Sequence, residues 1–341
     1  MNAGLIVIIL LLVLSILGIP IYLALGIGTL VALNMADMPF IVLPQKLFAG
    51  MNSSSLLAIP FFMLAGNIMS RSITGKLIDV SNALIGWIKG SLAVVTVLAS
   101  ALFGAISGSG VATASAVGGT TIPAMKEEGY PDHFAAAISG IAAILGPIIP
   151  PSITLIVYAS ITDLSVSKLF VGSVIPGILM AVGLIIYALF YGKKNDLPAH
   201  ERKSAKEVLL IFKDSIWALL MPVIILGGIF GGIFTPTESA AVAVVYALLV
   251  SLLIYKDIKI KDIPGIFVDG AISTATILML VGISKSSGYV ITTSGLPHQV
   301  LEVFSSFTNS TVVILLLLNI LFLVIGMLME ANAAIIMMTP I

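Results

Sequence analysis

Two short stretches rich in Gly, Ser and Pro interrupt long apolar segments, and their residue types and spacing could do chemistry. The first is Ser107-Gly108-Ser109-Gly110, and the second runs from Gly146-Pro147 to Pro150-Pro151-Ser152. At membrane depth, unpaired backbone N–H and C=O groups are costly unless protein or a water-filled cavity satisfies them. Two interruptions this close in sequence indicate a binding site for a small polar solute or ion.

The composition indicates a membrane protein. The chain has 341 residues, of which 59% are hydrophobic and 9% are charged, and its mean hydropathy is +1.19. A soluble domain carries about 25% charged residues, and many stretches here approach the ~20 apolar residues that cross a bilayer. Because the apolar runs are continuous rather than alternating, a transmembrane β-barrel is excluded. We predict an all-α polytopic membrane protein.

Several chemistries are excluded by composition. The chain has no cysteine, which rules out disulfides, thiolate metal sites, Fe–S clusters and a cysteine nucleophile. The three histidines, His133, His200 and His298, are far apart in sequence, and the net charge is zero. We therefore expect no metal cluster and no nucleic-acid partner. No catalytic residue and no cofactor are assigned, and the protein is not expected to be an enzyme.

The N-terminal apolar run from Ala3 to Asn34 is too long for one crossing, at about 48 Å as a single helix against a core of ~30 Å. We predict two short spans separated at Gly18-Ile19-Pro20. The alternative, a signal peptide, lacks the basic residues expected before its apolar core. Residues 35–52 are predicted to be a loop, and 53–69 the next span.

The rest of the chain divides by apolar runs and charged turns. We predict a helical hairpin at 91–124 around the Ser-Gly-Ser-Gly stretch, a broken helix at 134–161, a helix at 167–191 and a basic linker at 192–214. The remaining expected pieces are spans at about 215–234, 236–255 and 266–290, an amphipathic stretch at 291–310 and an apolar run at 311–328.

Lysine and arginine set the expected orientation. The 192–214 and 255–262 loops carry most of the basic residues and are placed in the cytoplasm. Residues 71–90 and 125–132 then also lie there, provided that 91–124 enters and leaves on one side. This makes 91–124 a re-entrant hairpin with Ser107–Gly110 near its tip, and it puts the N-terminus outside and a second hairpin, from 311, entering from the opposite side.

Weak internal matches share one offset. Pro20 pairs with Pro236 and Gly66 with Gly282, both 216 residues apart. The predicted topology gives the two halves opposite orientation, so we predict an inverted repeat of residues 1–214 and 215–341, with the substrate site near mid-membrane. Thr121-Ile122-Pro123 matches Thr339-Pro340, where the chain ends, so the second repeat is incomplete and a C-terminal truncation is expected.

Five stretches together resemble the large membrane subunit of TRAP (tripartite ATP-independent periplasmic) transporters. They are IPFFMLAGNIM (59–69), FGAISGSGVATASAVGGTTIPAM (103–125), GPIIPPS (146–152), GGIFTPTESAAVA (231–243) and GMLMEANAAIIMMTPI (326–341). The resemblance implies an elevator-type secondary transporter in the inner (cytoplasmic) membrane of a bacterium or archaeon. It also implies symport with Na⁺, a small four-helix membrane subunit, and a periplasmic solute-binding protein that delivers a C4-dicarboxylate, 2-oxo acid, sugar acid or sialic acid.

Na⁺ prefers oxygen ligands, which broken helices supply as carbonyls and hydroxyls. Pro150 and Pro151 have no N–H, so carbonyls one turn earlier are left without that donor. The second hairpin is expected to contribute to a mirrored site. The predicted ion-binding residues are Ser107, Gly108, Ser109, Gly110, Gly146, Pro150, Ser152, Gly326, Glu330 and Asn332.

A carboxylate substrate needs positive potential, which helix N-termini provide without a basic residue. Lys285 is an ionisable group inside a predicted span, and it is either a substrate ligand or a side chain that extends to the membrane interface. The predicted substrate-binding residues are Val111, Thr113, Ser115, Pro151, Ile153 and Lys285.

Three other functions are compatible with a polytopic membrane protein and fit these residues less well. An intramembrane serine protease needs a general base within reach of its serine, and no histidine lies in mid-span. A channel usually repeats its filter across subunits, whereas this chain carries two unequal hairpins of its own. A dicarboxylate or citrate exchanger that works without a binding protein is the closest alternative, and a co-purifying small subunit would separate it from a TRAP transporter.

Overall fold

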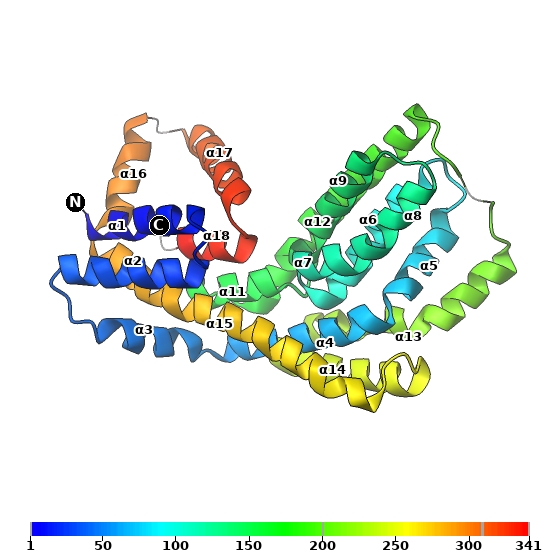
Figure 1. Ribbon diagram of the computed structural model, residues 1–341, viewed down its shortest axis with the longest axis horizontal. Helices are drawn as coiled ribbons and strands as arrows, with labels where there is room; N and C mark the ends of the chain where they lie inside the picture. The colour runs from blue at the N-terminus through cyan, green and yellow to red at the C-terminus, as the bar shows by residue number, and fades with distance from the viewer. Residues whose placement is uncertain (1, 200, 308–309, 340–341) are drawn as a thin grey trace. The chain divides into compact units, whose positions relative to one another are not determined.

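The computed structural model describes residues 2–199, 201–307 and 310–339, and every regular element within these ranges is a helix (Figure 1). The described helices fall into two compact units. The first unit comprises residues up to 56, 157–163 and those from 275 onward, and the second comprises 57–156 and 164–274. Each unit takes segments from both predicted repeats. The inverted orientation of the repeats itself stays a prediction.

The first unit is built on its N-terminal helix pair and the C-terminal part of a long helix. Its helices are α1 (Ala3–Ile16), α2 (Ile21–Met35), α3 (Val42–Met51), α16 (Leu296–Phe307), α17 (Thr311–Leu328) and α18 (Ala331–Met338), with the ends of α11 (Ile153–Thr162) and α15 (Ile263–Thr293). The predicted division of residues 3–34 is confirmed. Gly18, with φ +82°, donates to the carbonyl of Ser15 while Ile19 donates to that of Leu14, which is a Schellman end.

Residues 35–52 are not simply a loop, so that prediction was wrong. The helix α3 occupies Val42–Met51, with Pro44 in its first turn, where a missing N–H costs nothing. The sequence hid this helix because it is short and carries Gln45 and Lys46. It contacts α15 through Ser286, whose hydroxyl donates to the Leu43 carbonyl at 2.8 Å.

The second unit surrounds the hairpin predicted at 91–124. Its helices are α4 (Ala58–Ser72), α5 (Thr74–Ile85), α6 (Ser91–Ser107), α7 (Gly110–Thr113), α8 (Gly119–Glu127), α9 (Asp132–Ala143), α10 (Leu145–Ile148), α12 (Val166–Lys194), α13 (Ala205–Phe230) and α14 (Pro236–Leu249), with the first parts of α11 and α15. π-helical turns at Ala114–Gly118 and Val250–Ile254 continue α7 into α8 and extend α14. Figure 1 shows α6, α8, α9 and α12 side by side.

The predicted basic linker is shorter than 192–214. The helix α12 extends to Lys194, and α13 starts at Ala205 behind a capping box in which Ser204 and Glu207 bond each other's backbone N–H groups. The linker therefore covers 195–204. Residues 71–90, for which only a cytoplasmic position was predicted, contain the helix α5.

Both ends of the hairpin lie at the same end of the second unit, beside the C-terminus of α12. At the start, Gly90 donates to the carbonyl of Pro198 at 3.1 Å, and Lys89 pairs with Asp196. After the hairpin, Phe134 stacks on Tyr191 with ring centroids 3.7 Å apart. The chain thus goes out along α6, turns, and returns along α7 and α8.

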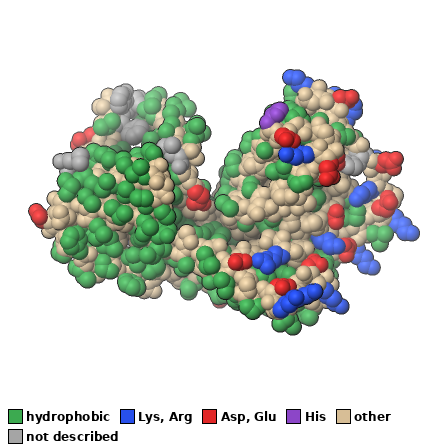
Figure 2. All heavy atoms as spheres, in the orientation of Figure 1, with side chains coloured by type: hydrophobic (Ala, Val, Ile, Leu, Met, Phe, Trp, Pro, Cys, Tyr) green, Lys and Arg blue, Asp and Glu red, His purple; other side chains and the backbone are tan. Residues whose placement is uncertain are grey.

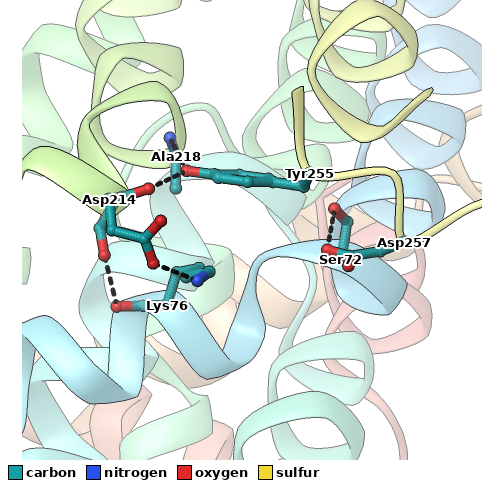
Figure 3. A network of polar contacts seen from close by, with 7 residues as sticks. Ser72, Lys76, Asp214, Ala218, Tyr255 and Asp257 are labelled. Atoms are coloured by element: carbon teal, nitrogen blue, oxygen red, sulfur yellow. Dashed lines mark hydrogen bonds and ion pairs between the residues drawn. The ribbon is translucent and has the colours of Figure 1, made fainter. Parts of the chain in front are cut away.

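A polar network fixes the junction of α4 and α5 to α13 and to the loop after α14 (Figure 3). The hydroxyl of Tyr255 donates to the Asp214 carbonyl at 2.9 Å and accepts from the Ala218 N–H at 3.3 Å. Lys76 pairs with the Asp214 carboxylate, and this hydrogen bond raises the pKa of Lys76. Ser72 donates to Asp257 at 3.1 Å. These contacts hold the loop that follows α14 against α4 and α13, and Lys76 ties α5 to α13 beside it.

Large apolar surfaces remain exposed, and Figure 2 shows hydrophobic side chains over much of the first unit, where α1 and α2 lie. On α12, Ile175, Leu179 and Phe190 are each at least 66% exposed, as expected for side chains that face lipid. Among the described residues, four helices are long and apolar enough to cross a membrane, or up to six if two bent pairs each count as one span. In one bent pair, the segment formed by α9 and α10 is bent by 44° relative to α11.

Candidate functional site

The tip of the hairpin is a helix break, as predicted. The helix α6 ends at Ser107, and Gly108 follows in the left-handed region with φ +63°, its N–H donating to the Gly104 carbonyl at 2.9 Å. Ser109 then caps α7 by accepting from the Ala112 N–H at 3.3 Å. One helix C-terminus and one helix N-terminus therefore meet within three residues.

The second break lies between α10 and α11. Ser152 caps α11, since its hydroxyl accepts from the Leu155 N–H at 3.2 Å and donates to the Pro147 carbonyl at 2.5 Å. Pro150 and Pro151 are buried, and neither has an N–H to offer the carbonyls of α10. The predicted broken helix is confirmed.

The two breaks contact each other directly. The N–H of Ile153 donates to the Gly108 carbonyl at 3.2 Å, so the start of α11 is bonded to the hairpin tip. A Cβ placed on Gly104 would lie 2.7 Å from the Cα of Gly146, and one on Gly146 would lie 2.7 Å from the carbonyl oxygen of Ser109. Only glycines allow this approach of α6 to α10.

Hydroxyl and carbonyl oxygens are gathered where the breaks meet. The hydroxyl of Thr113 donates to the Ser109 carbonyl at 2.7 Å and lies 3.4 Å from the hydroxyl of Ser107. Ser107, Thr113 and Ser152 are at most 2% exposed. These groups are all uncharged oxygen donors, which suits a hard monovalent cation better than a transition metal.

Most of the residues predicted to bind ion or substrate at the two breaks lie together here, but Val111 and Ser115 do not. The side chain of Val111 is 71% exposed, and Ser115 is exposed on the same helical segment. Both lie outside the buried oxygen cluster, so a role in substrate binding stays a prediction for each. The residues that the structure brings together are Ser107, Gly108, Ser109, Gly110, Thr113, Gly146, Pro150, Pro151, Ser152 and Ile153.

The predicted second-hairpin residues belong to the first unit. Glu330 caps α18: its carboxylate accepts from the N–H of Asn332 at 3.2 Å and from the Asn332 side-chain amide at 2.7 Å. Glu330 and Gly326 are exposed, and Asn332 is half-buried. The break between α17 and α18 is present, and its role in ion binding stays a prediction. Pro340, used in the repeat comparison, and His200 lie outside the described residues.

Lys285 lines an open cavity of about 640 Å³ within the first unit. Its ammonium group donates to the Ile161 carbonyl at 3.2 Å, and its stem lies against Gly50. A second lysine, Lys46, reaches the same cavity and lies 4.2 Å from the centroid of the Tyr289 ring. Lys285 is therefore half-buried and held by protein, and its neighbour supplies a second positive charge.

Sequence reasoning missed three contributors to these sites. Gly104 allows α6 to pack closely against Gly146, and Gly66 allows α4 to pack closely against Ser107. A Cβ on Gly66 would lie 3.2 Å from the Cα of Ser107. Gly104 and Gly108 are four residues apart, which is the small-residue spacing typical of tight helix contacts. This spacing is the signal from which the role of Gly104 could have been predicted. Lys46 was hidden inside the predicted loop.

Comparison with known proteins identifies the family. Residues 8–341 match the model for the DctM component of the tripartite ATP-independent periplasmic transporter. The chain belongs to the DctM family of TRAP transporter large permeases. This confirms the resemblance seen in the sequence, and it makes the protein a multi-pass membrane permease and not an enzyme.

Three relatives illustrate the match to TRAP permeases. A putative TRAP transporter large permease from Haemophilus influenzae is 38% identical over 328 residues, covering 96% of this chain and 77% of the relative. The C4-dicarboxylate large permease of Pseudomonas aeruginosa is 40% identical over 297 residues (87% and 70%). The sialic acid large permease of Vibrio cholerae is 35% identical over 298 residues (87% and 70%).

Proposed function

We propose that this TRAP permease carries out Na⁺-coupled uptake of a small organic acid across the inner membrane, with its N-terminus outside. A periplasmic binding protein delivers the acid, a small four-helix subunit completes the membrane complex, and transport follows an elevator mechanism. Relatives named for C4-dicarboxylate and sialic acid support a carboxylate substrate. No further cofactor is required.

The observation that carries the proposal is the buried oxygen cluster at the two breaks. Its hydroxyls and carbonyls come from Ser107, Ser109, Thr113 and Ser152, and they can replace the water shell of Na⁺ without a counter-charge. The N-terminal ends of the helical segments starting at Gly110 and Ile153 add positive potential for a carboxylate beside the ion.

The hairpin geometry supports a re-entrant position. The helix α6 has 17 residues and is about 25 Å long, less than the ~30 Å hydrocarbon core. The hairpin starts beside Pro198 of the basic linker, and the residues that follow it pack on Tyr191 near the end of α12. A hairpin that starts and ends on the cytoplasmic side would therefore place Gly108 inside the membrane.

Substituting the capping serines tests the ion site. Ser109→Ala and Ser152→Ala are each expected to weaken Na⁺ binding by about fivefold to tenfold, because a lost ligand to a cation costs about 1–1.5 kcal/mol. The measurement is the Na⁺ concentration that half-saturates substrate uptake into proteoliposomes. It is paired with the Na⁺-induced rise in melting temperature.

The matched control is Ser160→Ala, which removes a buried hydroxyl of α11 that donates to the Val157 carbonyl at 2.7 Å. Its Na⁺ dependence is expected to equal that of the unmodified protein. If Ser109→Ala and Ser152→Ala also leave the half-saturating Na⁺ concentration unchanged, the two hydroxyls are not Na⁺ ligands.

A further inference from the structure

An open groove on the second unit lies away from the two breaks, between the end of α5 and the start of α13. Its volume is about 590 Å³. Apolar side chains from Leu84, Leu209 and Phe212 form one part of its lining, and Trp87, Arg202 and Lys203 form another. The groove thus combines a hydrocarbon surface with two cations.

The polar part of the groove is organised around Trp87. Its indole N–H donates to the Leu84 carbonyl at 3.2 Å, which orients the ring, and the guanidinium carbon of Arg202 lies 5.1 Å from the ring centroid. Arginine over an aromatic face keeps its N–H donors directed outward for an anion. Lys203 is exposed beside it.

The groove lining carries two cations, Arg202 and Lys203, and the one carboxylate next to them in sequence, Glu201, is exposed and does not line it. Of the described residues that line it, none is acidic. Glu207 is held in the capping box with Ser204, and Asp196 pairs with Lys89, whose hydrogen bond lowers the pKa of that carboxyl. An occupant with a negative head group is therefore favoured.

The apolar part of the groove is exposed, and part of it lies on α13, a helix long and apolar enough to cross a membrane. Leu209 of α13 is 70% exposed, and Leu84 and Trp87, at the end of α5 and just after it, are 48% and 45% exposed. Tryptophan and basic residues at such a position mark the boundary between head groups and hydrocarbon. A soluble anion would leave this apolar surface uncovered, whereas a lipid covers it with an acyl chain.

We propose that this groove binds an anionic glycerophospholipid, with its phosphate at Arg202 and Lys203 and an acyl chain along Leu84, Leu209 and Phe212. Basic pockets at the cytoplasmic ends of membrane helices suit anionic head groups, which are enriched in that leaflet. The lipid would hold the 195–204 linker against α5. This inference uses the cytoplasmic placement of the basic linker proposed above, and it is tested independently of Na⁺ coupling and substrate because lipid binding is measured without either.

The test compares two double variants of the purified protein in neutral detergent. Arg202→Gln with Lys203→Gln removes both groove cations, and Lys193→Gln with Lys194→Gln removes two exposed charges from the last turn of α12 as a matched control. Phosphatidylglycerol binding is followed by native mass spectrometry and by thermal unfolding. We expect roughly tenfold weaker binding in the groove variant and no change in the control.

Three results would overturn the proposal. One is equal phosphatidylglycerol affinity in the two double variants. Another is equal retention of phosphatidylcholine and phosphatidylglycerol by the unmodified protein. This measurement is informative even if the groove variant does not fold. The third is displacement of the lipid by millimolar glycerol 3-phosphate, which would assign the groove to a free phosphate ester.

Discussion

Gly108→Ala is expected to lower the initial rate of uptake by at least tenfold. Gly108 has φ +63°, and a Cβ there would lie 2.6 Å from the carbonyl oxygen of Pro151. The left-handed conformation costs a non-glycine residue about 1–2 kcal/mol, and the clash moves the hairpin tip away from the start of α11. Since Ile153 donates to the Gly108 carbonyl, the oxygen cluster would lose its shape.

The control for this substitution is Gly119→Ala, in the same hairpin. A Cβ on Gly119 meets nothing within 4 Å, and its backbone is helical. Uptake is measured in proteoliposomes with equal amounts of inserted protein, so that loss of transport is separated from loss of folding. A Gly108→Ala protein that transports at the rate of Gly119→Ala would show that the hairpin tip is not part of the transport site.

Gly146→Ala is expected to abolish Na⁺-induced thermal stabilisation through packing alone. Its backbone is helical, and a Cβ would lie 2.7 Å from both the Ser109 carbonyl and the Thr113 hydroxyl. Forcing a methyl group into a closely packed contact costs about 1–3 kcal/mol. We expect the added methyl group to push α10 away from the hairpin. This movement would separate the oxygen atoms that are proposed to bind the ion.

The comparison variant is Gly140→Ala in α9, where a Cβ meets nothing within 4 Å. Alanine in an open helical position is expected to stabilise by about 0.5–1 kcal/mol. The two Gly→Ala changes should therefore shift the melting temperature in opposite directions. Equal Na⁺ responses in the two variants would mean that the α6–α10 contact does not shape an ion site.

The sequence was most informative where backbone chemistry decides the structure. Gly18, Gly108 and Pro150-Pro151 each mark a helix end that occurs in the fold. These residues act locally, through φ and through missing N–H groups, so their effect can be predicted without knowing their neighbours. Two of the five stretches that resemble the family, 103–125 and 146–152, lie at the breaks marked by Gly108 and Pro150-Pro151.

Contacts between segments could not be predicted in the same way. Nothing in the spacing of Gly104 and Gly146 indicates that they lie against each other, since that contact depends on how α6 crosses α10. The predicted loop at 35–52 contains α3, and residues 71–90, for which only a cytoplasmic position was predicted, contain α5. Both short helices lack the continuous apolar run used to recognise spans. Helices of this kind are stabilised by packing rather than by composition.

The sequence also did not predict which side chains at the breaks point into the oxygen cluster. Val111 and Thr113 are two residues apart, and yet Val111 is 71% exposed while Thr113 is fully buried in the oxygen cluster. On a helix, residues two apart point to different faces. Lys285 was selected by its position in an apolar run, but its companion Lys46 comes from 239 positions earlier and could only be found in the fold.

The side from which the hairpin enters the membrane is the most direct test of the account. The protein has no cysteine, so single cysteines can be placed at Lys89 and Glu127, at the two ends of the 91–124 hairpin. Membrane-impermeant thiol reagents are applied to right-side-out and inverted vesicles. We predict that both cysteines react only in inverted vesicles, from the cytoplasmic side. Reaction of the two cysteines from opposite sides would mean that the segment crosses the membrane and that the breaks do not form a re-entrant site.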